Sequence, residues 1–162
     1  MYKKNNRNFW NKFYKKKLAV NKPSNFAIFI HKFLKKKKIK IVDVGCGNGR
    51  DLIFFKKKNF DFIGIDLSKS ASHLIKKKLK KIEDRNKIFN YDFVKFNYKK
   101  YIKNTFSIYS RFTWHTINKK DEIIFLKKIS SLTNLQYIFI ETRSDKDDLF
   151  GKGRKMSKNE YI

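Results

Sequence analysis

Short runs of β-branched and aromatic residues alternate along this chain with longer stretches in which apolar residues recur every three or four positions. The short runs have the length and composition of buried strands, and they fall at 40–44, 60–66, 88–93, the first half of 105–117, and 135–140. The longer stretches have the period of helices that bury one face, and they fall at 24–34, 50–58, 71–82 and 124–132. The alternation predicts an α/β fold with a doubly wound parallel sheet and right-handed crossovers.

Two of the expected helices also show start signals and an apolar stripe. Ser24 follows Pro23 and is expected to cap the first helix, and Ser68 or Ser70 is expected to cap the helix after the second strand. The side chains expected to face the core are Phe26, Phe29, Ile30, Phe33 and Leu34 in the first helix, and Ala71, Leu74, Ile75, Leu79 and Ile82 in the other.

The most informative stretch is 40–55, where a strand, a glycine-rich turn and a helix follow one another. Gly45, Gly47 and Gly49 stand at alternate positions and make up half of the six glycines in the chain. Glycine lets the backbone turn sharply and lets a ligand approach without meeting a Cβ atom. The alternative is a tight turn that binds nothing, but such a turn needs one glycine and not three. The pattern therefore favours a nucleotide-cradling loop.

The spacing of this loop differs from that of a dinucleotide-binding loop, which has the pattern G-x-G-x-x-G. The third glycine comes one residue early, Arg50 follows it, and Asp43 lies two residues before the first glycine. A carboxylate at that position would repel a pyrophosphate, but it can receive an ammonium group. The pattern acid-x-Gly-x-Gly-x-Gly resembles the cofactor loop of class I S-adenosylmethionine-dependent methyltransferases.

This resemblance implies S-adenosyl-L-methionine as cofactor, a Rossmann-like sheet of about five strands in the order 3-2-1-4-5, and a loop that lies along the methionine and ribose. Asp66 ends the second strand, where a carboxylate in a βαβ unit faces the ribose and accepts hydrogen bonds from both hydroxyls. In the family, an acid just past the third strand often meets the adenine amino group, which indicates Asp92, with Phe93 beside the ring. No metal ligand is predicted. The expected cofactor-binding residues are Asp43, Gly45, Cys46, Gly47, Gly49, Asp66, Leu67, Asp92, Phe93 and Ser110.

A second cluster of polar residues follows the fourth strand, at the edge where open α/β sheets bind ligands. Arg111 and His115 lie there, and Arg143 follows the fifth strand at the same edge. We assign these three residues to catalysis: His115 would accept the proton of a hydroxyl acceptor, and the arginines would bind an anionic one. The alternative is that His115 is a core histidine and Arg111 a buried ion-pair partner of Glu141.

A narrower resemblance adds a substrate class. The stretches 9–14, 23–27, 109–115, 141–144 and 148–153 are similar to bacterial methyltransferases associated with capsule and other surface-polysaccharide biosynthesis. The resemblance implies O-methylation of a small molecule, or of a sugar or phosphoramidate group on a glycan precursor. Two alternatives remain: a nucleic-acid methyltransferase, or a truncated protein that binds the cofactor without activity.

Length and composition limit the class of protein further. The 162 residues suffice for one domain, and the single cysteine fits a reducing compartment. No apolar run approaches the ~20 residues of a membrane span, and no signal peptide is recognisable, so we expect a cytoplasmic protein.

The formal net charge of +27 makes nucleic acid or an anionic membrane a natural partner. The lysines are, however, dispersed near helix ends and on polar faces, as in proteins from AT-rich genomes, and form no single basic stripe. We therefore expect no specific nucleic-acid partner.

The domain is expected to comprise an N-terminal helical lid segment with an aromatic cluster at 9–14 (residues 1–36), a cofactor-binding core (37–144) and a flexible tail (145–162). Class I methyltransferases have seven strands, and this chain lacks apolar runs for the last hairpin. The fifth strand would then be an open edge through which the protein could self-associate.

Overall fold

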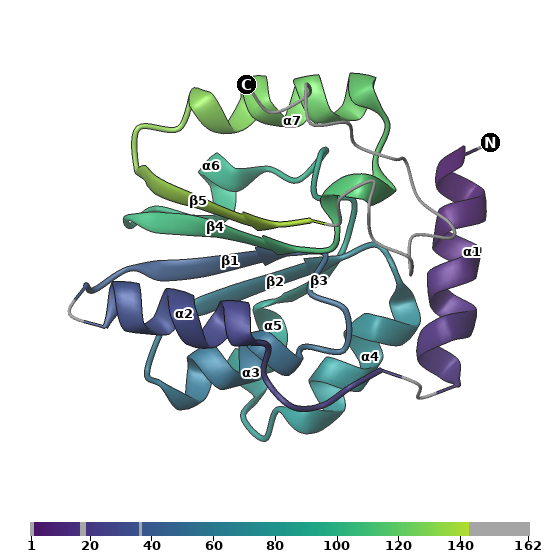
Figure 1. Ribbon diagram of the computed structural model, residues 1–162, viewed down its shortest axis with the longest axis horizontal. Helices are drawn as coiled ribbons and strands as arrows, with labels where there is room; N and C mark the ends of the chain where they lie inside the picture. Colours follow the sequence, from purple (N-terminus) through teal and green to yellow (C-terminus); the bar gives the residue numbers. More distant parts are fainter. Residues whose placement is uncertain (1, 17–18, 36, 143–162) are drawn as a thin grey trace.

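A computed structural model, which describes residues 2–16, 19–35 and 37–142, contains one five-stranded sheet with helices on both faces (Figure 1). All neighbouring strands pair in parallel, in the order β3-β2-β1-β4-β5. The predicted fold class and strand order are confirmed. The strands are β1 (Lys40–Val44), β2 (Phe62–Asp66), β3 (Ile88–Asn90), β4 (Phe106–Arg111) and β5 (Leu135–Glu141).

The helices form two layers and one separate element. Figure 1 shows α1 standing across the ends toward which the strand arrows point, outside both layers and in contact with α4. One layer contains α2 (Asn25–Leu34), α3 (Arg50–Lys57), α4 (Lys69–Lys78) and α5 (Ile82–Asn86), and the other contains α6 (Tyr98–Tyr101) and α7 (Lys119–Ser130). The separate element is α1 (Tyr2–Lys15), and a short 3-10 helix, η1 (Trp114–Thr116), joins β4 to α7.

The central strand β1 is buried on both sides, as its continuous apolar run predicts. Val42 and Val44 pack with Phe125 of α7, whereas Ile41 points to the other face and packs with Ile30 of α2. Fully burying a side chain of this size stabilises a fold by about 1.5–3 kcal/mol, so this strand anchors both helix layers. The residues that follow β1 are thereby held at the carboxyl edge of the sheet.

Three expectations about helix faces and caps need correction or completion. Phe29 and Phe33 of α2 are 61% and 50% exposed. The face of α2 that packs on the sheet carries Ala27, Ile30 and Leu34, and Phe33 lies beside this face against the rings of Tyr137 and Phe139. Ile82 is 59% exposed because α4 ends at Lys78 and Ile82 begins a separate short helix. Ser68, and not Ser70, caps α4, accepting the Ala71 N–H.

β5 forms one edge of the described sheet, where its only strand neighbour is β4. Ile138 on this strand is 42% exposed. Self-association through this edge stays a prediction. Within the described ranges, no helix is both long enough and apolar enough to cross a membrane.

Candidate functional site

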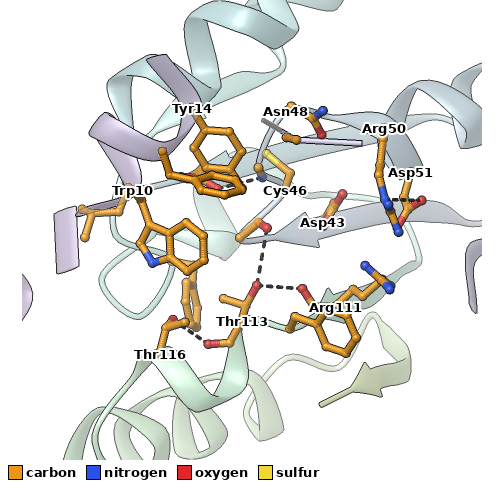
Figure 2. A pocket seen from close by; sticks show the side chains of 18 of the residues that line it. Trp10, Tyr14, Asp43, Cys46, Asn48, Arg50, Asp51, Arg111, Thr113 and Thr116 are labelled. Atoms are coloured by element: carbon orange, nitrogen blue, oxygen red, sulfur yellow. Dashed lines mark hydrogen bonds and ion pairs between the residues drawn. The ribbon is translucent and has the colours of Figure 1, made fainter. Parts of the chain in front are cut away.

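A cavity of about 440 Å³ lies at the carboxyl ends of the strands. Its floor is formed by the loop after β1 and the ends of β2 and β4, and α1 closes it from the opposite side (Figures 1 and 2). The order of the strands reverses between β1 and β4, because successive crossovers lead first to β2 and β3 and then to β4 and β5. A crevice at such a point is where open α/β sheets bind ligands.

The glycines of the loop are required by its backbone and by its neighbours. Gly45 and Gly47 have φ angles of 72° and 56°, which side-chain-bearing residues rarely adopt. A Cβ atom on Gly45 would lie 2.1 Å from Thr113 Oγ1, and one on Gly47 would lie 2.4 Å from Tyr14 Oη. Both residues line the cavity, so the loop presents bare backbone to any ligand there.

Gly49, which we expected at the cofactor, is not part of the cavity wall. It precedes the first residue of α3, and a Cβ atom on it would lie 2.6 Å from Ile75 of α4. Its role in this structure is to let α3 begin against α4. Sequence spacing alone does not separate a glycine that faces a ligand from one that faces a helix.

Asp66 lies at the end of β2 with both carboxylate oxygens hydrogen-bonded. Oδ1 accepts the Ser68 N–H at 2.7 Å, and Oδ2 accepts the Gly47 N–H at 2.8 Å. The side chain borders the cavity and is 8% exposed. Burial raises the pKa of Asp66 to about 6, and the two backbone hydrogen bonds act in the opposite direction. Each oxygen keeps acceptor capacity for a further donor, such as a ligand hydroxyl.

Asp43, in β1, is 3% exposed and also borders the cavity. Burial, followed by the nearby charges of Asp51 and Asp66, raises its pKa well above the ordinary value. Burial likewise raises the pKa of the Cys46 thiol, which lies in the same loop and so is disfavoured as a nucleophile. The remaining cofactor candidates at this end, Leu67, Asp92 and Phe93, all line the cavity.

The wall opposite the loop is aromatic and comes from α1. Trp10, Phe13 and Tyr14 line the cavity, and we refer to them as the aromatic wall (Figure 2). The rings contact one another edge-on or tilted, with Trp10 and Phe13 centroids 5.5 Å apart. The sequence showed this cluster at helical spacing but not what it covers. No residue of α2 lines the cavity, so within 1–36 the lining residues come from α1 and from Ala19 and Val20, which follow it.

The expected catalytic residues do not gather in the cavity. Arg111 lines it, pairs with Glu141 and lies over the Phe112 ring at 4.0 Å. This ion pair was the alternative interpretation of Arg111. Arg143 lies outside the described residues.

His115 and Ser110 are buried, 8% and 0% exposed, and neither lines the cavity. The cause for Ser110 is strand alternation, since Tyr109 and Arg111 on either side of it face the cavity. His115 lies in η1 between the buried Trp114 and Thr116, which does line the cavity. The general-base role of His115 stays a prediction, and its position favours the structural alternative.

A buried network at the other end of the cavity was not predicted. Asp51, in the first turn of α3, accepts hydrogen bonds from the Ser24 N–H at 2.7 Å, Ser24 Oγ at 2.9 Å and Tyr109 Oη at 2.8 Å. Arg50 Nε lies 3.6 Å from Asp51 Oδ1. The acid in the first helical turn was visible in the sequence, but its partners come from distant segments.

The cavity is strongly acidic in a basic protein. Among the described residues, its walls carry the two arginines and five carboxylates, which are Asp43, Asp51, Asp66, Asp92 and Asp121. Both arginines have a carboxylate partner, Asp51 for Arg50 and Glu141 for Arg111. The site therefore favours ligands that carry positive charge.

Comparison with known families agrees with this geometry. The sequence profile of the methyltransferase domain family matches residues 16–159, nearly the whole chain. The chain belongs to this family, which confirms the class I S-adenosylmethionine-dependent methyltransferase class inferred from the glycine loop. Among curated proteins, no sequence matches the chain.

Solved structures of methyltransferases share the fold. The magnesium protoporphyrin IX methyltransferase of Synechocystis PCC 6803, solved with bound SAM, superposes with a TM-score of 0.68 at 11% identity, over 98% of this chain and 81% of that one. The plantazolicin methyltransferase BpumL in complex with SAH gives 0.52 at 24% identity, over 71% and 43%. The glycopeptide N-methyltransferase MtfA with SAM gives 0.57 at 13% identity, over 72% and 51%. The chain thus spans about half the length of the latter two proteins.

Proposed function

We propose that this protein binds S-adenosylmethionine in the cavity and transfers its methyl group to a small-molecule acceptor. The observation that carries the proposal is the buried Asp66 carboxylate bonded to Gly47, beside a loop whose glycines leave no room for a Cβ atom. The residues present fit the cofactor, since bare backbone, buried acids and an aromatic wall suit a nucleoside that carries a sulfonium and an ammonium group.

Three of the acids in the cavity would each bind a different part of the cofactor. Asp66 would accept the ribose hydroxyls, Asp43 the ammonium group, and Asp92 the adenine amino group, with Phe93 against the ring. The cofactor, when bound, supplies an electrophilic methyl group on sulfur. The chain's own contribution is then mainly to hold an acceptor in line with that methyl group and to exclude water.

The acceptor end of the cavity is formed by residues from three elements. Tyr109 and Arg111 come from β4, Thr116 from η1 and Asp121 from the first turn of α7. The sequence resemblance suggests a hydroxyl or phosphoramidate group of a surface-polysaccharide precursor, methylated in the cytoplasm and bound as an anion by Arg111 and Arg143. We retain this as the first substrate hypothesis.

A second candidate is an amine acceptor. The five carboxylates of the cavity and the pairing of Arg111 with Glu141 favour a neutral or cationic group over an anion. A carboxylate can also take the proton that an ammonium group must lose before it attacks. One of the structurally similar proteins, MtfA, is a glycopeptide N-methyltransferase.

Calorimetry with S-adenosylmethionine and its demethylated product tests the cofactor assignment. Asp66→Ala removes the acceptor of two ribose hydroxyls and should cost about 2–4 kcal/mol of binding free energy. In the native protein, affinity should fall as the pH drops below about 6, because Asp66 takes up a proton there. Asp61→Ala is the control, since Asp61 is an acid outside the cavity. Unchanged affinity in Asp66→Ala would refute the assignment.

The acceptor is tested with isotopically labelled cofactor and fractionated cell extract. Label in glycan precursors supports the first hypothesis, label in small amines the second, and label in RNA would contradict both. Cofactor binding without transfer to any fraction would instead identify a binding protein without activity.

A further inference from the structure

One side chain of the helix that carries the aromatic wall, Asn11, is hydrogen-bonded to the start of α4. Asn11 lies in α1 between Trp10 and Phe13, and α1 packs beside α4. Its Oδ1 atom accepts two hydrogen bonds, from Ser68 Oγ at 2.8 Å and from the Ser70 N–H at 3.2 Å. Both donors belong to the start of α4, directly after the strand that ends in Asp66.

This contact continues into the cofactor-binding acid. The Ser68 N–H donates to Asp66 Oδ1 at 2.7 Å, and Asp66 Oδ2 accepts the Gly47 N–H at 2.8 Å. Asn11, Ser68, Asp66 and the glycine loop therefore form one continuous chain of hydrogen bonds. Tyr14, one helical turn after Asn11, reaches the same loop, since a Cβ atom on Gly47 would lie 2.4 Å from its hydroxyl oxygen.

The segment after α1 has separate attachments. Asn48 Nδ2 donates to the Val20 carbonyl at 2.9 Å, and Lys78 Nζ donates to Asn21 Oδ1 at 2.8 Å. These bonds hold 20–21 against the loop and α4 whether or not Asn11 is bonded. Loss of the Asn11 contact would therefore let α1 move away from the cavity while its following segment stays in place.

We propose that Asn11 is a positioning residue of the cofactor site: it holds the aromatic wall over the cavity and thereby sets how long a bound nucleoside stays. The inference rests on the proposed function for the identity of that nucleoside. Asn11 itself does not line the cavity. Its effect passes through Trp10, Phe13 and Tyr14 on one side, and through Ser68 to Asp66 on the other.

The test compares two substitutions in the full chain. Asn11→Leu has nearly the same size but no acceptor, so it removes both hydrogen bonds. Asn11→Asp keeps the acceptor oxygen and places a negative charge at the N-terminus of α4, which is favourable there, so it is the matched control. Should Asn11→Leu fail to fold, Asn11→Ala removes the same bonds without added apolar bulk.

The first measurement needs no ligand. The chain has two tryptophans, and Trp114 is 2% exposed, so quenching of fluorescence by acrylamide reports mainly on Trp10. Asn11→Leu should raise the quenching constant at least twofold, and Asn11→Asp should leave it near the native value. The second measurement is stopped-flow dissociation of S-adenosylhomocysteine, which should be about tenfold faster in Asn11→Leu and near native in Asn11→Asp.

The outcomes separate the two proposals. Native quenching and native dissociation in Asn11→Leu overturn the role of Asn11, and so does an Asn11→Asp variant that behaves like Asn11→Leu. If the native protein binds neither S-adenosylmethionine nor S-adenosylhomocysteine, the proposed function fails, while the quenching experiment still decides whether Asn11 holds the wall.

Discussion

Asp43 and Asp66 are two acids whose charged forms are disfavoured in the folded protein. Both carboxylates are buried beside the cavity, and burial raises the pKa of each. A buried carboxylate whose charge is not offset costs folding free energy at neutral pH. A cationic ligand between them would offset that cost, so the same residues that bind it destabilise the empty site.

The first prediction concerns Asp43→Asn. The pKa of Asp43 is higher in the folded chain than in the unfolded chain. The stability that Asp43 contributes is therefore fully present below its pKa in the unfolded chain, and it is lost as the pH rises through its pKa in the folded chain. Because asparagine does not titrate, the variant should match the native protein near pH 3.5 and exceed it increasingly toward pH 8. A tenfold difference in proton affinity between the folded and unfolded states corresponds to about 1.4 kcal/mol. Urea unfolding across this pH range measures the difference.

Asp61→Asn provides a control of opposite sign. Burial raises the pKa of Asp61, but hydrogen bonds from Lys87 and Lys40 outweigh it and hold the pKa below the ordinary value. Its stabilisation is therefore present above the unfolded pKa and is lost as the pH falls. The Asp61→Asn variant should be less stable than the native protein at neutral pH, and the deficit should shrink on acidification. The same pH trend in both variants would contradict our explanation.

His115 gives a second prediction for a single side chain. Since it is buried outside the cavity, His115→Gln should lower stability by about 1–3 kcal/mol while the turnover of folded enzyme and its pH profile stay close to native. Turnover on the identified acceptor and thermal melting measure the two effects separately. A loss of 10²–10⁴-fold in a folded variant would establish His115 as the base after all.

At the level of secondary-structure elements, the site is formed where the loop after β1, the turn around η1 and helix α1 come together. The turn is hydrogen-bonded to the loop, and α1 approaches the loop through Tyr14. Thr113 Oγ1 lies 3.4 Å from the Gly45 carbonyl oxygen, and Thr116 Oγ1 donates to the Thr113 carbonyl at 2.6 Å. The tight approach fixes how far the acceptor end lies from the cofactor loop.

Substituting Gly45 by alanine tests this approach. The φ angle of 72° costs an alanine about 1–2 kcal/mol, and the new Cβ atom would overlap Thr113. We expect a loss of about 2–4 kcal/mol in unfolding free energy together with weaker cofactor binding. Thr113→Gly removes the overlap but also removes the hydrogen bond to the Gly45 carbonyl, so the cost of Gly45→Ala is compared in the native and the Thr113→Gly backgrounds. In the Thr113→Gly background only the backbone term should remain, and an equal cost in both backgrounds would show that the contact does not limit the loop.

Across the molecule, charge is segregated. The chain has a formal net charge of +27, yet five of its 14 Asp and Glu residues line one cavity among the described residues. Outside this cavity, lysines are spread over the ends and polar faces of all the helix layers. The outer field attracts anions in general, while the cavity selects against them.

This segregation predicts that nucleic acid binds the outside of the protein and not the site. Fluorescence anisotropy with RNA and DNA of several sequences should show binding that weakens steeply with salt and does not depend on sequence. Saturating S-adenosylmethionine should not displace the nucleic acid. Tight, sequence-dependent binding at physiological salt would overturn this view and revive the nucleic-acid methyltransferase alternative.

The local and periodic features of the fold could be predicted from the sequence alone. The buried run of β1, the alternation of strands and helices, the three glycines and the acid at the end of β2 are all encoded within a few neighbouring residues, because strand and helix periods and glycine conformations are local properties. The strand order followed from the family resemblance. These features sufficed for the fold, for the family, and for locating the loop and Asp66 at the cavity.

The surroundings of that loop, in contrast, became known only from the folded chain. That α1 and not α2 covers the cavity, that Asp51 joins Ser24 and Tyr109, and that Ser110 and His115 are turned into the core depend on contacts between segments far apart in the chain. An apolar or aromatic stripe predicts which face of a helix will be buried, but it does not predict the surface against which that face packs. Asp66 lines the cavity, as the sequence predicts, whereas His115 does not, and the cause is the same. A strand end has a fixed place in a parallel sheet, whereas a residue in a connecting turn is oriented by the packing around it.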